Sequence, residues 1–418
     1  MSACRRRAKC LRTAALAGLV LAALSTASAS GEGGPRYAIR AGKVVTVSKG
    51  VIDAGVILVA DGKIEAVGRA TDVAVPEGYT TIDASDMWVM PGMIEVHSHA
   101  GVQGGLNDMV SQINPGMRIG DGVDPESYVV KAALAAGITT IETIPGSGTN
   151  HAGFGVIFKT AGATKQDRLV RRVGVMKIAQ AYNPERGGGD IGATRMGMTW
   201  LLRDHFARLR AYDGAWAAYE RGETAQPPQR DLALEDGRLA IRHLIPVLVH
   251  TWQVWGMLMT TRMFRDELSL NAVASHTEGS GPLTADTVRK SGIAVNVGPR
   301  VVDFYGTGDG MVTGVTAAYY AAGITALSVN TDAGGLDQAL LADKASMAAR
   351  FGMDEAAALR TVTMGAAGAL MLEDRIGSIE VGKDADLVIK RTSLLDPTTP
   401  VETVLVNGRI AYQREAPR

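Results

Sequence analysis

The chain has 418 residues, of which 46% are hydrophobic, and its 43 Lys+Arg balance its 43 Asp+Glu. This length and apolar content exclude a disordered chain and allow one large domain with a smaller companion. The balanced charge gives no indication of a nucleic-acid or anionic-membrane partner.

Residues 1–29 are predicted to be a secretory signal peptide. A basic cluster precedes the apolar run 14–24, which is too short to span a membrane and is followed by the small-residue triplet 27–29. Both cysteines, Cys4 and Cys10, precede the apolar run, so the mature chain is expected to have no disulfide and no thiol nucleophile. The expected location is periplasmic or extracellular, and Sec and twin-arginine export both remain open.

Short strand-like segments lie near both ends of the mature chain. The first group includes the hairpin signal Asp61-Gly62. The segments are 39–47, 55–59 and 63–67 near the start, and 377–382, 385–389 and 404–410 near the end. We expect 36–90 and 376–415 to pair into one small composite β domain.

Apolar strand-like runs alternate with helix-like text between these two groups, as in an α/β fold with parallel strands. The runs are 137–144, 173–179, 244–250, 271–276, 293–297 and 324–329, with helical patterns at 125–136 and 283–291. With the run that ends at His99 and another at 155–158, the count approaches the eight strands of a barrel over 91–375. A helical insertion near 184–236, with an amphipathic stretch at 196–219, is a surface elaboration or a lid.

Histidines and an aspartate close several of these runs. His97 and His99 are two residues apart at the end of one strand, so both side chains point to the same side. His250, His276 and Asp332 each close a separate run. Because imidazole and carboxylate bind zinc and related metals, and barrel active sites lie at the carboxyl ends of strands, this pattern indicates a metal centre.

Three motifs resemble the amidohydrolase superfamily, most closely its imidazolonepropionase-like and prolidase-like branch. They are Met90-Pro91-Gly92-Met93-Ile94-Glu95-Val96-His97-Ser98-His99, Ala135-Ala136-Gly137-Ile138-Thr139-Thr140, and Gly377-Ser378-Ile379-Glu380-Val381-Gly382-Lys383-Asp384-Ala385-Asp386-Leu387-Val388. The resemblance covers nearly the whole mature chain. It implies a distorted (β/α)8 TIM-type barrel with a small composite β-sandwich built from both termini.

The resemblance also implies roles for the strand-end residues. His97 and His99 would bind the more buried metal, His250 and His276 the second, and Asp332 would ligate metal and act as general base and acid. A lysine at the end of the fourth strand bridges both metals in many such enzymes after carbamylation, and Lys177 is the candidate. If Lys177 does not serve, Lys159 is the alternative, and if neither does, the site holds one metal ion.

Three further residues are candidates beside the metal. Tyr182 is a candidate catalytic donor to the developing oxyanion, or a tyrosine packed in its loop. His151 lies in a Gly-Ser-rich loop and is a candidate substrate contact or peripheral metal ligand. Arg300 is a candidate for binding a substrate carboxylate, or an arginine ion-paired at the rim.

The expected enzyme is an exported metal-dependent hydrolase that cleaves a C–N bond in an amide, cyclic amide or dipeptide with a metal-activated hydroxide. A single-metal deaminase or imidazolonepropionase-like enzyme is the alternative, and a non-catalytic binding module is a third. Zinc is the expected ion, with one or two per chain and a carbamate on Lys177 if there are two. The expected partner is a small amide or peptide, with no nucleic acid and no membrane after signal cleavage, and self-association is left open.

Overall fold

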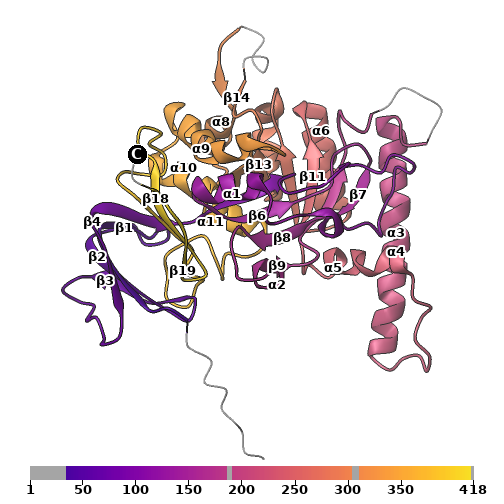
Figure 1. Cartoon of the computed structure of the whole chain (residues 1–418). Coiled ribbons are helices and arrows are strands. Elements are labelled where there is room, and N and C mark those ends of the chain that lie inside the picture. Colours follow the sequence, from indigo (N-terminus) through magenta and orange to yellow (C-terminus); the bar gives the residue numbers. More distant parts are fainter. Residues whose placement is uncertain (1–33, 186–190, 304–309, 416–418) are drawn as a thin grey trace, which may run out of the picture. The chain divides into compact units, whose positions relative to one another are not determined.

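A computed structural model describes residues 34–185, 191–303 and 310–415, which form a mixed α/β fold (Figure 1). The predicted signal segment 1–29 lies outside the described residues. Within those ranges, no helix combines the length and the apolar character that crossing a membrane requires.

Strands from both ends of the described chain share one sheet. Its strand order is β19-β18-β17-β4-β1-β2-β3. The strands are β1 (Tyr37–Val45), β2 (Val51–Ala60), β3 (Lys63–Arg69), β4 (Thr80–Pro91), β17 (Leu387–Lys390), β18 (Val401–Val406) and β19 (Arg409–Gln413). The two groups meet where β17 pairs antiparallel with β4, for example Ile389 with Val89.

Two tight turns in this sheet follow the local sequence. Asp61 and Gly62, both with positive φ, join β2 to β3 as their sequence predicts. At the other end, 404–410 is not one strand: Asn407 and Gly408 adopt positive φ and turn the chain from β18 into β19. Asn-Gly favours this turn because both residues tolerate left-handed backbone angles.

The strands of the central region form two larger sheets and a short pair. One has the order β16-β13-β12-β11-β10-β7, and the other β5-β6-β8-β9. Their strands are β5 (Met93–Ser98), β6 (Ile138–Thr143), β7 (His151–Phe154), β8 (Val156–Lys159), β9 (Leu169–Arg171), β10 (Met176–Ala179), β11 (Val247–Thr251), β12 (Ala272–His276), β13 (Ala294–Val297) and β16 (Leu327–Val329). A separate pair joins β14 (Val302–Asp303) to β15 (Thr313–Gly314).

Most of the central strands are parallel, as the alternating pattern predicts. Parallel pairs join β5 to β6 and link β10, β11, β12, β13 and β16 in turn. The run at 155–158 differs, because β8 pairs antiparallel with both β6 and β9. The connection from β6 to β8 contains β7 but no helix, so it lacks the helical crossover that a parallel pair requires.

Helices follow most of the parallel strands. They are α1 (Tyr128–Ala135), α2 (Lys165–Arg168), α3 (Arg195–Glu220), α4 (Leu232–Glu235), α5 (Gly237–Ile241), α6 (Gln253–Thr260), α7 (Ala285–Ser291), α8 (Val315–Ala321), α9 (Leu341–Arg350), α10 (Glu355–Thr361) and α11 (Met364–Ala369). Four tighter or wider turns are η1 (Ile119–Gly122), η2 (Thr261–Glu267), η3 (Gly281–Thr284) and η4 (Leu336–Leu340). The helix predicted at 196–219 is α3.

The apolar run before His97 is divided between two sheets at Gly92. β4 ends at Pro91 in the seven-stranded sheet, and β5 begins at Met93 in the other. The Gly92 N–H donates to the Asp386 carbonyl at 2.9 Å, and a Cβ here would lie 2.2 Å from Thr139 Oγ1. Glycine is therefore required where the chain passes between the sheets.

Apolar side chains pack on both faces of the central strands. Met176 and Ile178 of β10 pack with Phe206 of α3 on the helix side, whereas Val175 packs with Ile94 and other residues in a separate cluster. The two-residue period of the strand produces this division. It also places the alternate residue Lys177 on the same side as Val175.

Candidate metal centre

The predicted strand-end residues converge. His97 comes from β5, His276 from the last position of β12, and Asp332 from the segment after β16. One ligand atom from each of these three lies within 4.8 Å of the others. His250, on β11, stacks edgewise on His276 with ring centroids 4.2 Å apart. The carboxyl ends of parallel strands thus bring these side chains together, as in other α/β sheets.

Hydrogen bonds determine which nitrogen of His97 faces Asp332. Its Nδ1 lies 2.6 Å from Ser275 Oγ, and that hydroxyl donates to Asn296 Oδ1 at 3.0 Å. Because the hydroxyl has one proton, His97 Nδ1 must carry its own and donate it to Ser275. Burial lowers the pKa of His97 well below its usual range, so the ring is neutral. His97 Nε2 therefore presents a lone pair.

His99 and His276 are oriented by backbone carbonyls. Nδ1 of His99 lies 2.9 Å from the Ile144 carbonyl, and Nδ1 of His276 lies 2.6 Å from the Gly298 carbonyl. A carbonyl only accepts, so Nδ1 is the donor in both rings. The buried Nε2 of His276 has no hydrogen-bond partner among the described residues. Metal-ligating histidines commonly show this arrangement, in which the distal N–H is held by an acceptor.

Asp332 faces the lone pairs of these rings. Its Oδ1 lies 3.2 Å from Nε2 of His97 and 3.2 Å from Nε2 of His99. An anionic oxygen beside a neutral imidazole lone pair is unfavourable without a cation between them. The donor set therefore fits a bound metal ion.

Backbone strain marks the same place. His276, Thr277 and Asp332 have φ between 51° and 73°, although none is glycine. Such angles cost free energy and persist where the surroundings enforce them. Here they direct the side chains of His276 and Asp332 toward one centre.

Lys177 also reaches this centre. Its Nζ lies 3.2 Å from His97 Nε2, and its side chain is fully buried. Burial lowers its pKa to about 7, although Asp332 acts in the opposite direction. Lys159 lies elsewhere: its buried ammonium pairs with Asp386 and, at 3.0 Å, with Asp384. Of the two lysines, Lys177 alone contacts the strand-end histidines.

A cavity of about 510 Å³ opens onto His250, His276 and Asp332. Tyr182 lines it with 66% of its surface exposed, and its ring packs edgewise on Trp252. Arg300 also lines it, with its guanidinium 3.2 Å from the Glu278 carboxylate. The cavity is large enough for a small molecule to reach the centre.

His151 lies away from this cavity. It is fully buried on β7, and its ring packs against His205 of α3. Burial lowers the pKa of His151 well below its usual range and that of His205 to about 4. The structure thus brings Tyr182 and Arg300 to the rim of the cavity but does not bring His151 there.

Three functional neighbours of the centre were not identified from the sequence. The buried Glu95 carboxylate accepts from His97 N–H at 3.1 Å and from Thr331 N–H at 3.0 Å. It precedes His97 by two, so strand periodicity placed it on the same side. Ser275 and Glu278 flank His276 in the chain, but a serine or glutamate beside a histidine has no distinctive spacing.

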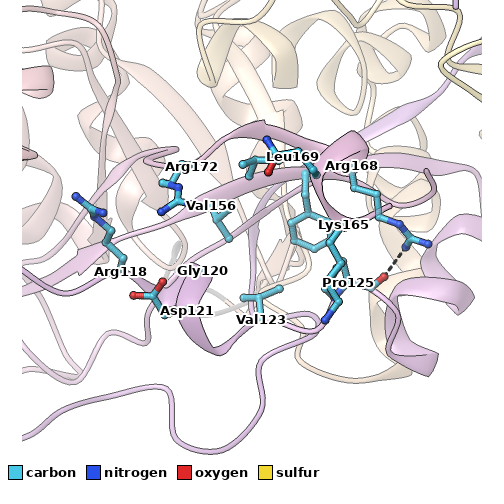
Figure 2. Close-up of a pocket in the computed structure, with 12 residues that line it drawn as sticks. Arg118, Gly120, Asp121, Val123, Pro125, Val156, Lys165, Arg168, Leu169 and Arg172 are labelled. Atoms are coloured by element: carbon cyan, nitrogen blue, oxygen red, sulfur yellow. Dashed lines mark hydrogen bonds between the residues drawn. The ribbon is translucent and has the colours of Figure 1, made fainter. Parts of the chain in front are cut away.

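A second cavity, of about 210 Å³, contains none of the predicted site residues (Figure 2). Arg118, Lys165, Arg168 and Arg172 line it. Arg118 is bound by Asp236, and Arg168 by the Pro125 carbonyl at 2.7 Å. These two guanidiniums are therefore already committed to partners within the chain.

Comparisons with known proteins agree with this architecture. The model of the Amidohydrolase family matches residues 306–411. The amidohydrolase tasK of Hapsidospora irregularis is 25% identical over 377 residues, which are 81% of this chain, and the chain spans 37% of that protein's length. Imidazolonepropionase of Sphingopyxis alaskensis is 26% identical over 364 residues, 81% of this chain and 87% of that protein.

A solved structure is also similar over nearly the whole chain. The crystal structure of an amidohydrolase from Thermotoga maritima MSB8 aligns with a TM-score of 0.80 and 26% identity, covering 90% of this chain and all of that one. This likeness implies a TIM-barrel-like α/β fold.

Proposed function

The chain belongs to the amidohydrolase superfamily, and on this premise we propose that it is a metal-dependent hydrolase of a C–N bond in an amide, a cyclic amide or a dipeptide. The observation that carries the proposal is the convergence of His97, His276 and Asp332 within 4.8 Å. Their lone pairs and negative charge meet beside a cavity that a small substrate can enter.

The same residues would hold the metal. His97, His99, His250, His276 and Asp332 are the proposed ligands, with a carbamate on Lys177 as the bridge if two ions bind. Zinc or a neighbouring transition metal suits imidazole and carboxylate donors. When bound, such an ion supplies Lewis acidity, which polarises a carbonyl and lowers the pKa of water.

The protein's own groups move the proton and position the substrate. Asp332 accepts a proton from the attacking water and delivers it to the leaving nitrogen, first as general base and then as general acid. Glu95 is a positioning residue, because it fixes the backbone of His97 and Thr331 on either side of the centre. Tyr182 is the proposed donor to the developing oxyanion from the cavity rim.

Arg300 is the proposed anchor for a substrate carboxylate. About half of its side chain is exposed at the cavity, and its Nε and Nη2 donate to the Glu278 carboxylate at 3.3 and 3.2 Å. A guanidinium can bind a carboxylate through two parallel hydrogen bonds. This favours substrates with a free carboxylate, such as dipeptides or N-acyl amino acids.

The proposal extends to architecture and location. We propose that β5, β6, β8, β10, β11, β12, β13 and β16 form a distorted (β/α)8 barrel over 91–375, and that 36–90 with 376–415 form a composite β-sandwich. We also propose that 184–236 is an insertion in the barrel and that residues 1–29 direct export to the periplasm or the outside.

A second candidate is a single-metal deaminase or imidazolonepropionase-like enzyme. The tight His97, His276 and Asp332 group alone is sufficient for one ion. A non-catalytic binding module is disfavoured because the predicted ligands are all present.

The test is a substrate screen with metal-loaded protein. Dipeptides, N-acyl amino acids, lactams and hydantoins are assayed against the unaltered chain, Asp332→Asn and the control Asp108→Asn in an exposed loop. Turnover by the unaltered chain and the control, with loss in Asp332→Asn, supports the proposal. Turnover that survives in Asp332→Asn contradicts the role of that carboxylate.

A further inference from the structure

His151 and His205 form a buried histidine pair outside the candidate catalytic centre. His151 on β7 is opposite Ile178 on β10, and paired residues of neighbouring strands point to the same side. Ile178 packs on the helix side of the sheet, whereas Lys177 points to the other side, toward His97. The strand register therefore separates His151 from the catalytic histidines and directs it toward α3.

The pair is held close and has unused nitrogen atoms. The ring centroids are 5.0 Å apart with a 53° angle between the planes, and each residue is at most 4% exposed. Within the described part of the chain, both ring nitrogens of His151 and Nε2 of His205 have no hydrogen-bond partner. Leaving buried polar atoms unpaired costs about 1–3 kcal/mol each.

Two amide side chains beside the pair are also unsatisfied. Gln112 Nε2 and both polar side-chain atoms of Asn150 lack partners among the residues described. The Gln112 carbonyl accepts from the His151 backbone N–H at 3.0 Å, and its side-chain oxygen accepts from Asn150 N–H at 3.3 Å. Asn150 Oδ1 is thus an unused oxygen in the residue that precedes His151.

A cavity of about 350 Å³ provides access. Gln112 and His205 line it together with Asp204 and Arg208 of α3. Asp204 and Arg208 are about half and two-thirds exposed, so the cavity connects His205 to solvent.

We propose that His151 and His205 bind a transition-metal ion at a second site, separate from the catalytic centre. With N–Zn distances of about 2.0–2.1 Å, two imidazoles on a tetrahedral ion have centroids roughly 5 Å apart, which the pair already satisfies. Neutral imidazoles suit zinc, copper or nickel. Water from the cavity supplies the remaining positions.

The test measures zinc bound by the full chain. After equilibration with zinc, metal content and affinity are compared for the unaltered chain, His151→Gln and His205→Gln. The control is His243→Asn, because His243 is exposed and asparagine tolerates its positive φ. We expect the first two variants to bind one equivalent less, or to bind it at least about tenfold more weakly, and the control to match the unaltered chain.

A folded His205→Gln variant, by near-ultraviolet circular dichroism, that keeps the full zinc content and affinity would overturn the proposal. If both variants fail to fold, zinc-edge anomalous diffraction from zinc-soaked crystals of the unaltered chain decides. A peak between the two rings supports the second site, and its absence, with the rings bridged by water, contradicts it.

Discussion

Ser275 Oγ lies 2.6 Å from His97 Nδ1, and this contact controls the chemistry of the opposite ring nitrogen. The Ser275 hydroxyl donates its proton to Asn296 Oδ1, and Asn296 Nδ2 in turn donates to Ser328 Oγ at 2.8 Å. A buried polar chain thus fixes the tautomer of His97 from the neighbouring strands. Residues that need not contact the metal thus set the tautomer of a metal ligand.

Replacing Ser275 by alanine should weaken metal binding. His97 Nδ1 would lose its acceptor, and the ring could rotate or take the other tautomer. We expect zinc affinity to fall by about 10–100-fold, measured by chelator competition. Ser328→Ala is the matched control, because Ser328 lies in the same polar chain but does not contact His97. Equal affinities for the two variants would show that the contact does not orient the ligand.

Bicarbonate should change the metal content through Lys177. A buried amine with few neighbours that stabilise its ammonium form can react with carbon dioxide to give an anionic carbamate. We expect bicarbonate to raise the metal content of the catalytic centre from one equivalent to two in the unaltered chain, and to leave it at one in Lys177→Ala. An ion at the His151–His205 site adds the same amount under both conditions. Lys290→Ala, an exposed lysine on α7, should behave like the unaltered chain. A carbamate carbon signal in NMR with labelled bicarbonate checks the modification, and metal content independent of bicarbonate would contradict it.

Removing Asp386 should destabilise the fold far more than removing a surface carboxylate. Asp386 pairs with the fully buried Lys159 and accepts from Asn407 N–H at 2.9 Å. Without Asp386, the buried ammonium of Lys159 would have only Asp384, at 3.0 Å, to balance its charge. Asp386→Ala should therefore lower the free energy of unfolding by about 3 kcal/mol, the lower end of the cost of breaking a buried ion pair. Chemical denaturation measures this value. Asp86→Ala, which breaks the exposed pair with Arg391, should cost less than about 1 kcal/mol.

Glu142 should make stability depend on pH. Both carboxylate oxygens are buried without partners among the described residues, and burial raises the pKa well above its usual range, although Arg171 opposes this. The Glu142 carboxyl packs against Gly155 and Gly174, and a Cβ atom on either glycine would overlap it. The folded state therefore binds a proton that the unfolded state releases near pH 4.3.

The difference in bound protons between the folded and unfolded states sets the direction of the pH dependence of stability. Stability from Glu142 is complete below the unfolded pKa and is lost as pH rises toward the folded pKa. Glu142→Gln should remove this loss, so the variant becomes more stable relative to the unaltered chain between about pH 5 and 8. Denaturation across this range measures the effect, with the exposed Glu77→Gln as control. A constant difference at all pH values would show that Glu142 does not titrate on unfolding.

Strand ends were predictable because their signal is local. His250 and His276 each end a short, mostly apolar run, and β11 and β12 end at or one residue after them. The antiparallel β8 was not predictable in the same way, because an apolar run of four residues reads identically in either direction. The division of one run at Gly92 depends on contacts with Thr139 and Asp386, which are distant in sequence.

The residues of the candidate site also differ in how far the sequence could predict them. His97 and Asp332 were recognisable by residue type and position, and the structure brings them within 3.2 Å. The pairing of His151 with His205 depends on where α3 packs, and no pattern within α3 carries that information. The orientation by Ser275 and Glu95 depends on hydrogen bonds between strands far apart in the chain.

The place of β17 between β18 and β4 has a consequence for biosynthesis. The edge of β4 that pairs with β17 stays open until residue 390 has left the ribosome, although β1, β2 and β3 are made hundreds of residues earlier. An open strand edge can pair with another chain. During translation this edge of β4 is therefore open to pairing with other chains until β17 is added, and in the finished sheet β17 covers it.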